Sequence, residues 1–119
     1  MPPLGRQVLA DLYACDRGVL ADAAAIEGHM LEAARRAGAR VVATEFHRFS
    51  PHGVSGVVVI AESHLAIHTW PEHGFAALDL FTCGESLRVE PCFDYLVDAL
   101  GCQHHTRTAI SRGGAPPNP

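Results

Sequence analysis

The sequence contains no lysine: all nine of its basic side chains are arginines, against 13 acidic residues and eight histidines. A chain without lysine cannot anchor pyridoxal phosphate as a lysine Schiff base, and it cannot form a phosphate-binding loop of the GxxxxGK type. If the protein performs amine chemistry with a carbonyl, that carbonyl must come from another source. The net charge of −4 also argues against a nucleic-acid binder, which usually presents a basic face.

Apolar runs long enough to cross a membrane are also missing, because the longest one extends only from Val57 to Ala61. Residues 1–6 lack the charged-then-apolar pattern of a signal peptide, so we expect a cytosolic protein with reduced thiols. None of the four cysteines forms a CxxC pair, and we expect no zinc site built on them. A length of 119 residues with 48% hydrophobic content predicts one globular domain, residues 1–119, with a polar tail over residues 113–119.

Hydrophobic periodicity predicts two helices and a set of short strands. One helix is expected over residues 19–37, ended by Gly38, and a second begins near Pro91 and is ended by Gly101. Short connections in the middle of the chain favour antiparallel pairing, so the predicted fold class is α+β: a two-layer α/β sandwich in which two helices cover one face of an antiparallel sheet. The strands are expected at residues 7–15, 40–49, 54–61, 64–70, 75–83 and 103–112.

The second face of this sheet carries a mixture of aromatic and polar side chains. Alternation along the strands assigns to it Glu45, His47, Phe49, His64, His68 and Trp70. Leu65 has the opposite parity and is predicted to point toward the helices. A partly aromatic face is seldom left bare to water, so we expect it to form a site, a subunit contact, or both.

Three interpretations of the polar residues compete. His64 and His68 stand about 13 Å apart on an extended strand, which is too far for one metal ion, so no metal is expected. Ser55 lies in Gly53-Val54-Ser55-Gly56, which is not the elbow of a serine hydrolase, and no spacing establishes a triad. The third interpretation, buried histidines and serines in a binding or structural domain, stays open for each residue taken singly.

Taken together, the residues from Val54 to Glu72, which include Glu62-Ser63-His64-Leu65, closely resemble the core of prokaryotic S-adenosylmethionine decarboxylases. The segment from Phe75 to Gly84, which ends in Phe-Thr-Cys-Gly, resembles the segment that follows in that family. With similar stretches near the N-terminus, the resemblance covers residues 4 to about 112. Two positions depart from the family's usual residues: Gln7 stands where many relatives have histidine, and Ala61 where serine is usual.

The resemblance implies a proenzyme that cleaves itself between Glu62 and Ser63 into residues 1–62 and 63–119. The Ser63 hydroxyl attacks the carbonyl of Glu62 and converts the peptide into an ester. Elimination of the Glu62 carboxylate and hydrolysis then leave a pyruvoyl group at the new N-terminus. Ser55 and His68 match the positions that assist this processing, with His68 as the base.

The pyruvoyl group from Ser63 is the implied cofactor. Its carbonyl forms a Schiff base with the amine of S-adenosylmethionine and accepts the electrons left when carbon dioxide departs. Cys83 matches the proton donor to the α-carbon, whereas the other three cysteines have no such match and are interpreted as structural. Phe49 resembles the residue that stacks on adenine and Glu72 the one that holds the ribose hydroxyls, and Trp70 is a further substrate contact because it shares a face with His68.

The resemblance also implies a homodimer of cleaved protomers, with two copies of each chain, whose sheets face each other across the sites. The product is the aminopropyl donor for spermidine and other polyamines. Two alternatives remain: a pyruvoyl-dependent arginine or ornithine decarboxylase on the same fold, and a non-enzymatic binding homologue that never cleaves.

Overall fold

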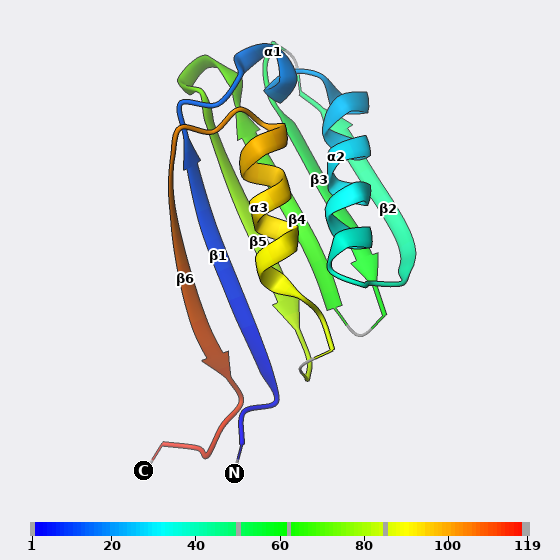
Figure 1. Cartoon of the computed structure of the whole chain (residues 1–119), viewed down its shortest axis with the longest axis vertical. Coiled ribbons are helices and arrows are strands. Elements are labelled where there is room, and N and C mark those ends of the chain that lie inside the picture. Colours follow the sequence, from blue (N-terminus) through cyan, green and yellow to red (C-terminus); the bar gives the residue numbers. More distant parts are fainter. Residues whose placement is uncertain (1, 50, 62, 85, 118–119) are drawn as a thin grey trace.

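The computed structural model describes residues 2–49, 51–61, 63–84 and 86–117, and within these residues six strands form one antiparallel sheet (Figure 1). The strand order is β2-β3-β4-β5-β1-β6. The elements are β1 (Gly5–Tyr13), α1 (Arg17–Leu20), α2 (Ala23–Arg36), β2 (Val41–Arg48), β3 (Val54–Ile60), β4 (Ser63–Trp70), the 3-10 turn η1 (Pro71–His73), β5 (Phe75–Thr82), α3 (Val89–Ala99) and β6 (His104–Arg112). Because α2 and α3 cover the same face of the sheet, the predicted α+β sandwich is confirmed.

The first helical region differs from its prediction. A single helix was expected over residues 19–37, whereas the structure has two helices, α1 and α2, separated by a turn. Asp16 and Asp22 are the cause, because the side chain of each accepts a hydrogen bond of 3.1 Å from a backbone N–H three residues further on and so caps a new helix. The expected two helices therefore become three in the described residues. Gly38 follows the end of α2 with a φ of +77°, as predicted.

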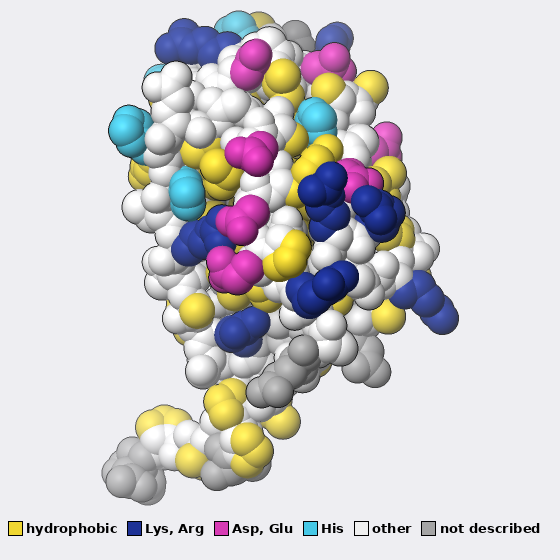
Figure 2. Space-filling view, in the orientation of Figure 1, with side chains coloured by type: hydrophobic (Ala, Val, Ile, Leu, Met, Phe, Trp, Pro, Cys, Tyr) yellow, Lys and Arg dark blue, Asp and Glu magenta, His cyan; other side chains and the backbone are white. Residues whose placement is uncertain are grey.

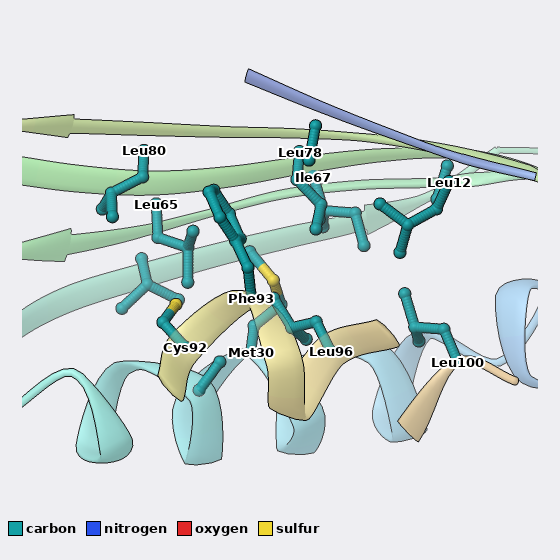
Figure 3. Close-up of a cluster of buried hydrophobic side chains, with 14 of the residues drawn as sticks. Leu12, Met30, Leu65, Ile67, Leu78, Leu80, Cys92, Phe93, Leu96 and Leu100 are labelled. Atoms are coloured by element: carbon teal, nitrogen blue, oxygen red, sulfur yellow. The ribbon is translucent and has the colours of Figure 1, made fainter. Parts of the chain in front are cut away.

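The core fills the space between the sheet and the two longer helices (Figure 3). From α3, Phe93, Leu96 and Leu100 point into it at three- and four-residue spacing and are completely buried. From β4, Leu65 and Ile67 are at most 1% exposed, which confirms that Leu65 points toward the helices. Burying such side chains stabilises the fold by roughly 1.5–3 kcal/mol each, so the core determines which face every strand presents.

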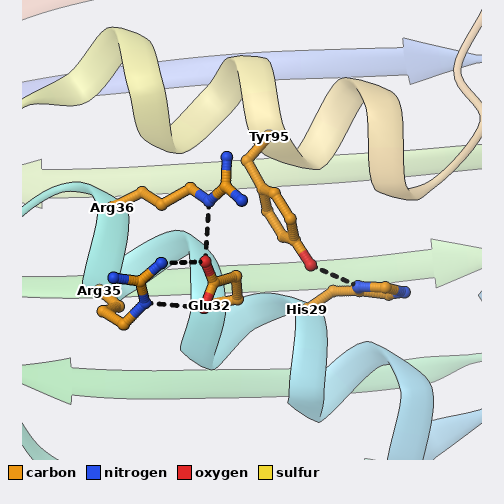
Figure 4. Close-up of polar contacts among 5 residues, drawn as sticks. All are labelled: His29, Glu32, Arg35, Arg36 and Tyr95. Carbon is orange, nitrogen blue, oxygen red and sulfur yellow. Dashed lines mark hydrogen bonds and ion pairs between the residues drawn. The ribbon is translucent and has the colours of Figure 1, made fainter.

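The outer surface of the helices carries interspersed acidic and basic side chains (Figure 2). On α2, Glu32 accepts hydrogen bonds from Arg35 and Arg36, which hold the pKa of its carboxyl at about 2 (Figure 4). The Arg36 guanidinium lies over the Tyr95 ring, and His29 Nδ1 is 2.9 Å from the Tyr95 hydroxyl oxygen, so the cluster connects α2 to α3. Ion pairs this exposed add little stability. None of the helices in the described residues is long and apolar enough to span a membrane.

The two halves of the chain are interleaved in the sheet. The first strand, β1, lies between β5 and β6 and pairs with both, although all of its partners come from the second half of the chain. In the same way β3 pairs with β4 across the connection at residues 61 and 62. A cut at this connection would therefore leave two chains held together by complete strand pairings on both sides.

Candidate active site

A pocket lies at one end of the sheet face that the helices leave open. Its volume is about 280 Å³, and a neighbouring hollow of about 300 Å³ shares Ser55 and His68 with it. The pocket is formed where β2 ends, β3 begins and β4 passes into η1. Its lining residues are Phe49, His52, Gly53, Ser55, His68, Thr69, Trp70 and Glu72.

Ser55 and His68 form the polar centre of this pocket. They are directly opposite each other in the antiparallel pairing of β3 with β4, so their side chains lie on the same face. A hydrogen bond of 2.8 Å joins the Ser55 hydroxyl to His68 Nδ1, and the His68 tautomer decides which of them donates. Since neutral imidazole and hydroxyl can exchange a proton at this distance, the pair can act in proton transfer.

Aromatic rings and a carboxylate surround the pair. Phe49 is 50% exposed and Trp70 is 41% exposed, so both rings offer free faces toward the open side. The Trp70 ring centroid is 6.5 Å from that of His68. Glu72, in η1, is exposed at the rim. The structure thus brings together Ser55, His68 and the three residues that the sequence assigned to substrate binding.

A buried threonine that the sequence analysis did not single out holds this end of the sheet. Thr69 Oγ1 accepts a hydrogen bond from the backbone N–H of Val54 and donates one to the carbonyl of Leu20, each 2.8 Å long. Gly53 precedes Val54 with a φ of +97°, and a Cβ there would lie 2.9 Å from the Thr69 carbonyl oxygen. Thr69 therefore connects α1 to the starts of β3 and the end of β4, on either side of the Ser55–His68 pair.

Ser63 and Cys83 lie at the other end of the sheet. Ser63 begins β4 opposite Ile60, and Cys83 follows β5, whose Phe81 is opposite His64. Five residues of strand separate Ser63 from His68, which corresponds to about 16 Å. Ser63 is half-buried and Cys83 is exposed, whereas Glu62 lies outside the described residues. Within one chain the structure therefore does not bring Ser63 and Cys83 to the Ser55–His68 pair.

One further hydroxyl belongs to the Ser63 end. The register of β4 with β5 continues from the His64–Phe81 pair to place Thr82 across from Ser63. Thr82 is 1% exposed, and its Oγ1 has no hydrogen-bond partner among the described residues. An unpaired buried hydroxyl is costly, so this atom is available to an acceptor that appears at position 63.

The remaining cysteines and the competing interpretations can now be compared with the structure. Burial raises the pKa of the Cys92 thiol to about 12, which suits a structural role. Among the described residues no group of three His, Cys, Asp or Glu side chains could hold a metal ion. The Ser55–His68 contact resembles the first two members of a hydrolase triad, but none of the hydrogen bonds found in the described residues connects His68 to a carboxylate.

Comparison with known proteins identifies close relatives. A family model described as S-adenosylmethionine decarboxylase matches residues 6–113. The S-adenosylmethionine decarboxylase proenzyme of Acidithiobacillus ferrooxidans is 50% identical over 113 residues, covering 95% of this chain and 85% of the relative. The proenzyme of the same name from Thermotoga maritima is 56% identical over 100 residues, covering 84% and 77%. The crystal structure of the adenosylmethionine decarboxylase from Aquifex aeolicus superposes with a TM-score of 0.88 at 32% identity and covers 100% of this chain and 98% of that one.

The role of Thr69 can be tested by removing its hydroxyl. Thr69→Val keeps the side-chain shape but leaves the Val54 N–H and the Leu20 carbonyl without their buried partner. We expect the free energy of unfolding, measured with urea, to fall by about 2–4 kcal/mol. Thr69→Ser keeps the hydroxyl and is the control. Equal stability of the two variants would contradict the role given to these hydrogen bonds.

Proposed function

The chain belongs to the S-adenosylmethionine decarboxylase family, and from this premise we propose that it decarboxylates S-adenosylmethionine with a pyruvoyl group made from its own Ser63. The product is an aminopropyl donor for polyamine synthesis. The observation that carries the proposal is the pocket in which Phe49, Trp70 and Glu72 surround the Ser55–His68 pair. The relatives' description as proenzymes supports self-processing of this chain.

Processing begins with attack of the Ser63 hydroxyl on the carbonyl of Glu62. The ester that forms then loses the Glu62 carboxylate by elimination, and hydrolysis releases ammonia and leaves the pyruvoyl group. His68 is proposed as the base that removes the serine proton, and Ser55 orients its imidazole through their 2.8 Å contact. The interleaved sheet supports this step, because residues 1–62 and 63–119 remain paired after the cut.

A second copy of the chain is needed to complete the site. The hydroxyl of Ser63 and the imidazole of His68 belong to opposite ends of β4, about 16 Å apart. A two-fold axis through the open sheet face brings the Ser63 end of one protomer against the His68 pocket of its partner, and symmetry makes two such sites. The exposure of Phe49 and Trp70, together with the apolar Val57, Val59 and Ala66 on the same face, supports this face as the contact.

The residues at the Ser63 end fit a pyruvoyl group. Thr82 Oγ1, buried and without a partner among the described residues, is a donor available to an oxygen of the group. When present, the pyruvoyl carbonyl supplies an electron sink for the loss of carbon dioxide from a substrate amine. Cys83 follows directly and is proposed to deliver the proton to the α-carbon, since its exposed thiol stands on the same side of the partner interface.

The pocket end is proposed to hold the nucleoside. The free faces of Phe49 and Trp70 suit stacking with adenine and contact with the positively charged sulfonium. The Glu72 carboxylate accepts hydrogen bonds and is placed at the rim to bind the ribose hydroxyls. Arginine and ornithine have neither a purine nor a ribose, so these residues favour S-adenosylmethionine over them.

Self-cleavage is tested by denaturing mass spectrometry of the purified chain. We expect two fragments, residues 1–62 and a pyruvoyl-blocked 63–119, and a single uncut chain for Ser63→Ala. An uncut wild-type chain after prolonged incubation would support the non-cleaving binding homologue instead.

The same measurement tests whether His68 acts across the dimer. His68→Ala alone should cleave slowly, whereas co-expression with Ser63→Ala should restore cleavage of the His68→Ala chain, because mixed dimers place an intact His68 opposite its Ser63. Co-expression with a chain that carries both substitutions is the matched control. Equal cleavage in the two mixtures would mean that the site forms within one chain.

The proton-donor role of Cys83 predicts that Cys83→Ala is processed but turns over poorly. We expect kcat to fall roughly 100- to 10,000-fold, the usual contribution of a positioned general acid. Carbon dioxide release measures the rate, and Cys92→Ala is the control for loss of a thiol elsewhere. Full activity of Cys83→Ala would refute the assignment.

Substrate choice follows from the pocket. Carbon dioxide release should occur with S-adenosylmethionine and not with arginine or ornithine. Glu72→Gln should raise KM for S-adenosylmethionine more than it lowers kcat, since the carboxylate binds the ribose away from the reacting bond. Release from arginine or ornithine, with none from S-adenosylmethionine, would overturn the choice of substrate.

A further inference from the structure

Two cysteines from distant parts of the sequence lie together at the pocket end of the sheet, away from the residues assigned above. Cys15 follows β1, and Cys102 lies between α3 and β6. Backbone hydrogen bonds join the two segments on both sides of this pair: Gln103 N–H donates to the Tyr13 carbonyl at 3.1 Å, and Asp16 N–H to the Leu100 carbonyl at 2.8 Å. The backbone thus holds Cys15 and Cys102 against each other.

The two thiols are in contact and differ in accessibility. Cys15 is 7% exposed and belongs to the core, whereas Cys102 is half-buried at its edge. Burial raises the pKa of the Cys15 thiol to about 12, and a hydrogen bond with the Cys102 side chain contributes to the same rise. The Cys102 thiol also donates to the carbonyl of His104 at 3.0 Å. A small oxidant can therefore reach Cys102, and the sulfur behind it is Cys15.

The other two cysteines are not candidates for this pairing. Cys15 N–H donates to the carbonyl of Gly74, next to the start of β5, whereas Cys83 follows the end of that strand. Eight residues of strand separate these ends by about 26 Å. Cys92 is completely buried on α3 among the core side chains (Figure 3).

We propose that Cys15 and Cys102 form a reversible disulfide under peroxide stress. The Cys102 thiol is oxidised to a sulfenic acid while the peroxide is reduced and releases water. The Cys15 sulfur then attacks the Cys102 sulfur and displaces a second water, which completes the S–S bond. To reach bonding distance the Cys102 side chain gives up its hydrogen bond to His104. A dithiol reductant restores both thiols.

The disulfide has a particular consequence in a self-cleaved protein. Cys15 belongs to residues 1–62 and Cys102 to residues 63–119, so the bond connects the two chains that processing separates. It also fixes the Cys15 segment, whose N–H bonds Gly74 behind the Glu72 turn, and so stiffens one wall of the substrate pocket. This interchain consequence rests on the proposed self-cleavage, whereas the disulfide itself does not.

The experiment treats the purified full chain with hydrogen peroxide, blocks free thiols, and analyses it by denaturing mass spectrometry with and without reductant. Without reductant we expect the two fragments joined, with a loss of two hydrogens relative to their summed mass, and reductant should separate them. A non-reducing peptide map should pair Cys15 with Cys102. Formation of the link should accelerate as the pH rises toward the Cys15 pKa, because the attacking sulfur is a thiolate.

Cys102→Ser should abolish the link, and Cys92→Ala, which removes a thiol that no part of the proposal uses, should retain it. Over-oxidation of Cys102 without a link, or linkage only through Cys83 between molecules, would overturn the proposal. If the reduced sample shows one intact chain, self-cleavage has failed, but the peptide map still decides the disulfide. In Ser63→Ala the same pairing should appear within a single chain.

Discussion

The antiparallel pairing of β3 with β4 is the constraint on which the rest of this structure depends. It places Ser55 opposite His68, and it turns the chain at residues 61 and 62 so that Ser63 begins the next strand. Because side chains alternate along a strand, the same pairing buries Leu65, Ile67 and Thr69 beneath the helices. A slip of one residue would exchange these two sets, which would place His68 in the core and remove it from Ser55.

The position of β1 explains how a backbone cut in this hairpin is compatible with a stable fold. Since β1 pairs with β5 and β6, the N-terminal chain is inserted between two strands of the C-terminal chain. The helices add to this, because α2 from the first chain and α3 from the second share one core and are joined outside it by the His29–Tyr95 contact. Separating the chains would break both strand pairings and expose that core.

The sequence was sufficient to predict the layer architecture, the strands to within a few residues and the inward orientation of Leu65, because these follow from local periodicity. It was not sufficient for the break between α1 and α2, where the caps at Asp16 and Asp22 interrupt a continuous apolar stripe. The division of the site between two ends of the sheet was also missed, although the strand rise applied to His64 and His68 could have been applied to Ser63 and His68. Contacts between distant segments, such as Thr69 with Leu20 or Cys15 with Cys102, depend on the tertiary fold and have no local signal.

The division of the site also imposes an order on maturation. If the base for cleavage comes from the partner, a folded but unpaired chain lacks the group that starts processing, and only dimers cut themselves. The exposed aromatic face then serves both steps: it drives pairing by burying Phe49 and Trp70, and pairing excludes water from the reacting bond. A carbonyl cut from the backbone thereby appears only where a complete substrate pocket already surrounds it. In a chain without lysine, this couples the supply of the electrophile to assembly rather than to the capture of a free cofactor.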